Sequence, residues 1–153
     1  MSGSELADMI KADRFLPELK AAKKEDVLVE LLKPLVSQGH VKNKALVLAT
    51  LRQRENLGST GLGKGVAIPH CRTLAVTDLH ITVGISREGI DFEAVDRKKV
   101  YVFFLIIAPP HDEFNRYLPL LGKIVELVRD GKKRKALLKA EDFESFKKVI
   151  QGG

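Results

Sequence analysis

The residue types best suited to chemistry lie in one run of the chain, from Arg54 to His70. The run holds an arginine at its start, a serine and a threonine among closely spaced glycines, and one histidine at its end. Glycine tolerates positive φ and lets another group approach the backbone closely. Pro69 restricts Ile68 to an extended conformation and lacks an amide donor, so His70 emerges on stiff backbone at the end of a short strand. An imidazole in that position, beside a loop rich in amides, is suited to an anionic reactant.

Phosphoryl transfer through histidine is one reaction that this set of residues could support. It needs a neutral imidazole with one free nitrogen, which an ordinary pKa of about 6.5 provides near pH 7. A backbone carbonyl or a carboxylate could hold the other nitrogen, and the sequence leaves that choice open. Arg54 offers a forked donor that matches phosphate oxygens. Further hydrogen bonds to phosphate are expected from the loop residues Ser59, Thr60, Gly61, Gly63 and Gly65.

Each of these residues also has an ordinary structural interpretation. Arg54 could bond the last carbonyl groups of its own helix. Ser59 and Thr60 could be turn residues that bond nearby backbone. A lone histidine is more often structural than catalytic, and the motif around His70 is what favours a chemical role.

Apolar periodicity predicts the elements that position this run. Strands are expected over residues 66–68, 79–86 and 100–108; the second is predicted to be half-buried and the third to be a central strand covered on both faces. Helices are expected over residues 23–37, 44–55, 114–130, 132–139 and 141–150, with a short helix and an extended stretch before them. This pattern predicts an α/β fold, a central mixed β-sheet flanked by α-helices on both faces, in a single domain of residues 1–153 with its core at about 4–150.

Four local signals refine this prediction. Asn43 is expected to cap the helix that carries Arg54 near its C-terminus. Pro34 is expected to kink or shorten the last turn of the preceding helix. Gly131 is expected to end the helix over residues 114–130. Arg87-Glu88-Gly89 predicts a turn after the second long strand.

Composition and charge exclude several classes of function. The chain has 153 residues, of which 44% are hydrophobic and 30% charged, as is usual for a globular protein. Its longest apolar run, Val100 to Pro110, is too short to span a bilayer, and the N-terminus does not resemble a secretory signal. Much of the net charge of +6 lies at Lys132 to Lys135. Because no aromatic residues interrupt that run, it predicts a solvated helix face and no nucleic-acid partner.

Metal and nucleotide chemistry are also disfavoured. The glycine run lacks the G-x-x-x-x-G-K-[ST] order of a nucleotide-binding loop, because Gly65 follows Lys64. His40, His70, His80 and His111 are not at zinc-ligand spacing. Cys71 is the only cysteine, which indicates a reducing cytoplasmic setting, and next to His70 it is expected to point to the opposite side of the chain as a small buried side chain.

The run from Arg54 to His70 resembles the active-site segment of enzyme IIA domains of the fructose/mannitol type (type 2) in the bacterial sugar phosphotransferase system. The matching residues are Arg54-Glu55, Ser59-Thr60-Gly61, Gly63, Gly65 and Ala67-Ile68-Pro69-His70. The resemblance implies that His70 accepts a phosphoryl group and that Arg54 contacts it.

The chain departs from that family pattern at two places. The family usually has a second histidine at the start of a helix, and Tyr117 stands at that position here. A tyrosine hydroxyl donates a hydrogen bond but is not cationic near neutral pH. His111 precedes it by six positions and is expected to be a solvated loop residue. Lys64 replaces the asparagine often found between the two glycines.

The resemblance implies a phosphocarrier. His70 would take a phosphoryl group from the histidine-containing phosphocarrier protein and pass it to a cysteine-bearing IIB domain in sugar uptake, without a metal or cofactor. The alternative is a stand-alone regulatory protein of the nitrogen-related type, in which phosphorylation of His70 selects protein partners. The sequence names no sugar and leaves both uses open.

Overall fold

A mixed β-sheet forms the centre of the structure, which is a computed structural model that describes residues 1–152. Its central strand β6 (Val100–Ala108) pairs antiparallel with β5 (His80–Ile90) on one side. On the other side it pairs in parallel with β3 (Val66–Ala67) and then with β4 (His70–Arg72). β1 (Phe15–Leu16) lies parallel to β5 at one edge, and β2 (Gly61–Gly63) lies antiparallel to β3 at the other.

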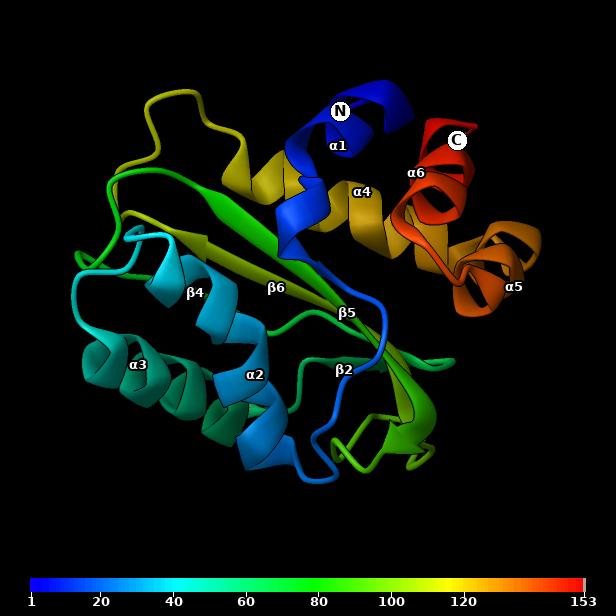
Figure 1. Cartoon of the computed structure of the whole chain (residues 1–153), viewed down its shortest axis with the longest axis horizontal. Coiled ribbons are helices and arrows are strands. Elements are labelled where there is room, and N and C mark those ends of the chain that lie inside the picture. The colour runs from blue at the N-terminus through cyan, green and yellow to red at the C-terminus, as the bar shows by residue number, and fades with distance from the viewer. Residues whose placement is uncertain (153) are drawn as a thin grey trace.

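Helices cover both faces of the sheet, as Figure 1 shows. One face is covered by α2 (Lys24–Ser37) and α3 (Lys44–Leu57). The other is covered by α1 (Gly3–Met9), α4 (Tyr117–Arg129), α5 (Gly131–Lys139) and α6 (Phe143–Gln151), and a 3-10 turn at Ala12–Arg14 follows α1. The predicted fold class is therefore confirmed. Among residues 1–152, the structure contains no helix long and apolar enough to cross a membrane.

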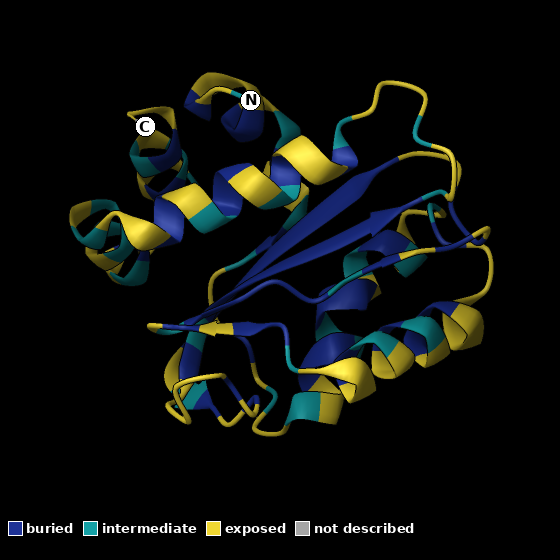
Figure 2. Ribbon diagram, turned by 180° about the vertical axis from the view of Figure 1, so that it is seen from behind, coloured by how far each residue is buried: buried dark blue, intermediate teal, exposed yellow. Residues whose placement is uncertain are grey.

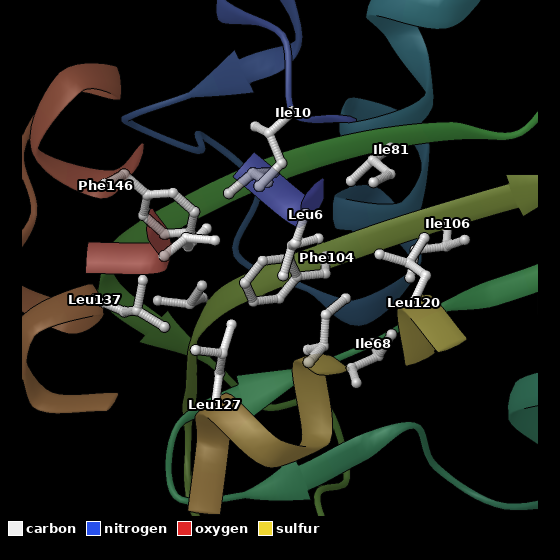
Figure 3. Close-up of a cluster of buried hydrophobic side chains, with 14 of the residues drawn as sticks. Leu6, Ile10, Ile68, Ile81, Phe104, Ile106, Leu120, Leu127, Leu137 and Phe146 are labelled. Atoms are coloured by element: carbon white, nitrogen blue, oxygen red, sulfur yellow. The ribbon is translucent and has the colours of Figure 1, made fainter. Parts of the chain in front are cut away.

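The alternation of side chains along β6 creates two apolar cores. Phe103, Leu105 and Ile107 point toward α2 and α3. Phe104 and Ile106 point the other way, into the cluster around α4 and α6 that Figure 3 shows with Leu120, Leu127 and Phe146. Figure 2 shows the sheet buried between helices whose outer surfaces are exposed. Each fully buried large apolar side chain contributes about 1.5–3 kcal/mol, so β6 stabilises both layers at once.

The strand β5 is more buried than its alternating pattern predicts. Residues 80–86 are buried on both faces, although Thr82 and Gly84 read as the solvent-facing side in the sequence. A Cβ at Gly84 would lie 2.6 Å from a methyl carbon of Leu31, so the missing side chain lets α2 approach the strand closely. The prediction of a half-buried strand is wrong. A small residue in a strand can face solvent, but it can also allow a helix to pack closely, as Gly84 does here.

Some of the local predictions made from the sequence are confirmed, and others are wrong. Asn43 accepts the amide of Leu46 at 3.0 Å and begins α3, as expected. The helix α2 continues through Pro34 to Ser37, so Pro34 does not shorten it. Gly131 does not end α4; it is the first residue of α5, because the Asp130 side chain accepts two amides of that helix. Residues 87–89 lie inside β5, where the register shifts between Ile85 and Ile90, rather than in a turn between elements.

The helix α4 begins at Tyr117 and not at Phe114. Asn115 has a φ of 51°, which interrupts any helix that started earlier. The carboxylate of Asp112 accepts the amides of Arg116 and Tyr117, so it satisfies two donors at the helix start. The loop before α4 thus sets where Tyr117 enters the structure.

The hairpin between β2 and β3 turns through residues with positive φ. Gly63, Lys64 and Gly65 have φ values of 90°, 59° and 85°. Two consecutive central residues with positive φ are what a type I′ hairpin turn requires. Lys64 is the unfavourable member because its side chain is strained there, although its amide donates to Asp96 Oδ2 at 2.8 Å.

Lys64→Asn is expected to stabilise the protein, because asparagine tolerates the left-handed region better than lysine does. The substitution also keeps the hydrogen bond from the backbone amide of residue 64 to Asp96. The expected gain is about 0.5–1 kcal/mol, or about 1–4 °C in Tm. Thermal unfolding of the wild type, Lys64→Asn and the control Lys64→Ala measures this effect. If Lys64→Ala gains as much as Lys64→Asn, backbone strain at this position is not the cause.

Candidate active site

His70 is held by one hydrogen bond from its own segment. It opens β4, where it lies opposite Ile106 of β6. Its Nδ1 is 2.7 Å from the carbonyl oxygen of Ile68. Because a carbonyl oxygen only accepts, Nδ1 carries the proton and donates it, which leaves the lone pair on Nε2. Of the two partners that the sequence left open for the fixed nitrogen, the structure shows the backbone carbonyl.

The surroundings of His70 favour its neutral form. Burial is the largest influence and lowers the pKa of the imidazole below its usual 6.5. The hydrogen bond to Ile68 raises the pKa, the Arg54 charge lowers it, and the Glu55 charge raises it. The net direction is downward, so the ring is neutral at pH 7 and Nε2 can act as a nucleophile.

Arg54 caps its own helix, as its structural interpretation predicts, and its charge also acts on His70. One of its terminal nitrogens donates to the carbonyl oxygen of Gly58 at 2.8 Å, which caps the end of α3. Its charge nevertheless lowers the pKa of His70. A guanidinium has five N–H donors, so a single cap leaves others for an anion. The two interpretations of Arg54 are therefore compatible.

Ser59 and Thr60 bond to the protein itself. The Ser59 hydroxyl donates to the carbonyl oxygen of Phe92 at 2.9 Å and accepts the amide of Gly61 at 3.0 Å. The amide and the hydroxyl of Thr60 both donate to the carboxylate of Glu55, which also pairs with Lys24 Nζ at 3.1 Å. These bonds favour the turn interpretation of both residues, because each hydroxyl proton is already donated within the fold.

The glycines of the loop do not gather around His70. The amide of Gly61 is taken by Ser59, and Gly65 accepts the amide of Val102 on β6. His70 lies beside Ile106, four residues farther along that strand, which corresponds to roughly 13 Å. Gly63 and Gly65 form the hairpin turn between β2 and β3, and their contact with phosphate stays a prediction.

Tyr117 lies beside His70, at the position where the family pattern has a second histidine. The two ring centroids are 6.2 Å apart in an edge-on arrangement. Only 7% of Tyr117 is exposed, and burial is the main reason why the pKa of its hydroxyl is raised to about 12. The phenol is neutral near pH 7, so it brings a hydrogen-bonding group and an aromatic face to the site but no charge.

Arg72 contacts Tyr117, and no motif in the sequence singled it out. Its guanidinium carbon lies 4.4 Å from the centroid of the Tyr117 ring. Period-2 alternation could have found it, because His70 and Arg72 are two residues apart on one strand and share a face. Cys71 between them packs into the α2 and α3 core, and burial raises its thiol pKa to about 12, as expected for an unreactive side chain.

The other histidines lie apart from this site. His40 Nε2 and His80 Nδ1 are 2.8 and 3.1 Å from two nitrogens of Arg14, so both rings accept hydrogen bonds from that guanidinium. His111 is exposed in the loop before α4. Within the part of the chain that the structure describes, no group of three or more His, Cys, Asp or Glu side chains could hold a metal ion.

The buried carboxylate of Glu55 is expected to be a major stabilising contact for the loop. Glu55→Gln leaves Lys24 without its buried partner, so we expect a loss of about 2–3 kcal/mol. Glu25→Gln is the matched control, since Glu25 pairs with Arg52 at 2.7 Å while 62% of its side chain is exposed; that loss should be under about 1 kcal/mol. Urea unfolding measures both. Equal losses for the two variants would contradict a special role for Glu55.

The pKa of His70 is expected to respond to Arg54. NMR titration should place the pKa of His70 below 6.5 in the wild type, and Arg54→Gln should raise it because a positive charge near the ring is removed. Arg52→Gln on the same helix is the control and should leave the pKa of His70 in place. A titration that is unmoved by Arg54→Gln would separate Arg54 from the site.

Comparison with known proteins agrees with this geometry. Residues 8–152 match the family described as "Phosphoenolpyruvate-dependent sugar phosphotransferase system, EIIA 2". The fructose-specific EIIA component of Haloferax volcanii is 33% identical over 129 residues, which cover 84% of this chain and 83% of that protein. A nitrogen regulatory protein of Bradyrhizobium diazoefficiens is 31% identical over 145 residues, 95% and 94% of the two chains. The fructose-specific EIIABC component of Bacillus subtilis is 30% identical over 86% of this chain, which spans only 21% of that protein.

Solved structures show the same fold. The nitrogen regulatory protein IIA-Ntr of Neisseria meningitidis superposes with a TM-score of 0.86 at 26% identity, over 95% of this chain and 99% of that one. The enzyme IIA of the mannitol system of Escherichia coli, solved in complex with phosphorylated enzyme IIB, superposes at 0.76 and 20% identity over 94% and 99%. Sequence match and fold agree, and this chain belongs to the EIIA type 2 family of the phosphoenolpyruvate-dependent sugar phosphotransferase system.

Proposed function

We propose that His70 is a phosphoryl carrier that is loaded by the histidine-containing phosphocarrier protein and unloaded to a cysteine-bearing IIB domain in sugar uptake. The observation that carries this proposal is the bond from Nδ1 to the Ile68 carbonyl, which leaves Nε2 with its lone pair. Neighbouring Arg54 and the lowered pKa of His70 support the same role. The reaction belongs in the cytoplasm, where such partners meet.

The proposed transfer is a displacement at phosphorus. The lone pair of Nε2 attacks phosphorus, and the bond from phosphorus to the ring nitrogen of the donor protein breaks. The Nδ1 proton stays on His70, where Ile68 accepts its hydrogen bond. Arg54 contacts the phosphoryl oxygens through N–H groups that its cap leaves free. Transfer to the IIB cysteine repeats this displacement, with the thiolate as nucleophile and Nε2 as leaving group.

A regulatory use of the same chemistry is the second candidate. The match to a nitrogen regulatory protein covers nearly the whole of both chains, 95% and 94%. In this use, the phosphoryl group on His70 would change the charge of the surface around it and select protein partners by that charge. Both candidates share the loading step and differ in the fate of the phosphoryl group.

Incubation with phosphoenolpyruvate, enzyme I and the phosphocarrier protein is expected to add one acid-labile phosphate per chain. His70→Gln should abolish the addition, while His111→Gln is the matched control and should retain it. Heteronuclear NMR should place phosphorus on Nε2. Phosphate on another residue, or on Nδ1, would refute the proposed carrier.

Mixing the phosphorylated chain with an isolated IIB domain separates the two candidates. Transport predicts that the phosphate moves to the IIB cysteine within seconds to minutes. Retention of the phosphate on His70, together with a partner protein that binds only one phosphorylation state, favours regulation.

A further inference from the structure

We infer that Arg72, held in place by the ring of Tyr117, is a second cation that binds the phosphoryl group on His70. The inference rests on the proposed function and adds a phosphate-binding residue to it. Three features of the structure carry it: the shared face of β4, the packing of Tyr117, and the free charge of Arg72.

The first feature is the direction of the side chains on β4. His70 and Arg72 are two residues apart, so they leave the strand on the same side. Cys71 packs among the side chains beneath α2 and α3. The contacts of His70 and Arg72 with Tyr117 show that both point toward the start of α4.

The second feature is the fixed position of the Tyr117 ring. The ring is buried, and its backbone amide donates to Asp112 at 2.9 Å at the first residue of α4. The same ring meets His70 edge-on and has the Arg72 guanidinium 4.4 Å from its centroid. Stacking on an aromatic face stabilises an arginine by about 0.5–1 kcal/mol at an accessible site and restricts where its N–H groups lie.

The third feature is that the charge of Arg72 is available. Within residues 1–152, Arg72 makes no ion pair with a carboxylate. The neutral hydroxyl of Tyr117 cannot replace the charge of a protonated histidine. Arg72 presents a planar donor set that fits phosphate oxygens. A phosphoryl group on Nε2 therefore meets Arg54 from the end of α3 and Arg72 from β4.

The guanidinium of Arg72 lies over the ring of Tyr117 and also bonds its hydroxyl. The inference assigns the positioning role to the ring, and variants of Tyr117 test it against the hydroxyl. Tyr117→Phe keeps the aromatic face and should keep Arg72 in position. Tyr117→Leu removes that face but remains apolar. The two variants therefore separate this inference from a role in which the hydroxyl of Tyr117 donates a hydrogen bond to the phosphate.

The experiment compares the rate of phosphoryl transfer from the phosphocarrier protein in the wild type and four variants. Arg72→Gln is expected to slow transfer by about 10- to 100-fold, at or somewhat below the cost of removing one donor at a charged transition state. Tyr117→Leu should also slow transfer, whereas Tyr117→Phe should stay within about twofold, since it loses only the hydroxyl. The double variant Arg72→Gln/Tyr117→Leu should transfer within about twofold of the rate of Arg72→Gln, because the two changes remove the same interaction.

A readout without a protein partner keeps the test independent of the proposed function. Phosphoramidate phosphorylates histidine directly, and ³¹P NMR then follows ionisation of the attached phosphoryl group. Loss or displacement of a cation that contacts the phosphoryl group should raise that pKa by about 0.5–1 unit in Arg72→Gln and Tyr117→Leu. Arg129→Gln, at the other end of α4, removes the same charge and should leave it unchanged.

The outcomes are separable. Wild-type rates and an unchanged phosphoryl pKa in Arg72→Gln overturn the inference and leave the proposed function intact. If Tyr117→Phe is as slow as Tyr117→Leu, the hydroxyl matters and the stacking role is wrong. A wild-type chain that phosphoramidate loads at His70 but the phosphocarrier protein does not load refutes the proposed function, while the ³¹P titrations still decide the role of Arg72.

Discussion

The central strand β6 is buried on both faces, and this burial constrains the rest of the structure. A buried strand has to pair its amides and carbonyls with protein, because no water reaches them. β5 satisfies one edge along most of its length. The other edge is satisfied by two short pieces, β3 and β4, whose interruption coincides with Pro69. The carbonyl of Pro69 accepts the amide of Ile106 at 2.9 Å, so the ladder continues although proline has no amide to donate.

The orientation of the His70 ring follows from that interruption. The break between β3 and β4 frees the carbonyl of Ile68 from the ladder and turns it toward the imidazole two residues later. The same contact selects the tautomer and orients the ring, while burial lowers the pKa of the imidazole. The break that lets the sheet pair around Pro69 therefore also fixes the tautomer that the proposed phosphoryl transfer needs.

Much of the glycine-rich loop near His70 is engaged in bonds within the protein. The hydroxyls of Ser59 and Thr60 and the amides of Thr60 and Gly61 bond within the fold, with the buried carboxylate of Glu55 accepting both donors of Thr60. The carboxylate of Glu55 thus organises the loop that was expected to bind a phosphoryl group. The charge of Arg54 acts on His70, and the ring of Tyr117 contacts both His70 and the guanidinium of Arg72.

The sequence alone determined the features that depend on covalent structure and on neighbours along the chain. Pro69 before His70, the cap at Asn43 and the apolar run of β6 were readable because each acts within a few residues. Only the tertiary structure decided which partners the polar groups meet: Ser59 with Phe92, Glu55 with Lys24, and Arg72 with Tyr117. The distance of Gly63 and Gly65 from His70 depended on strand register, and the burial of β5 depended on how closely α2 packs. The physical reason is that a hydrogen bond or a stacked ring is satisfied by any suitable group nearby, and the fold decides which group that is.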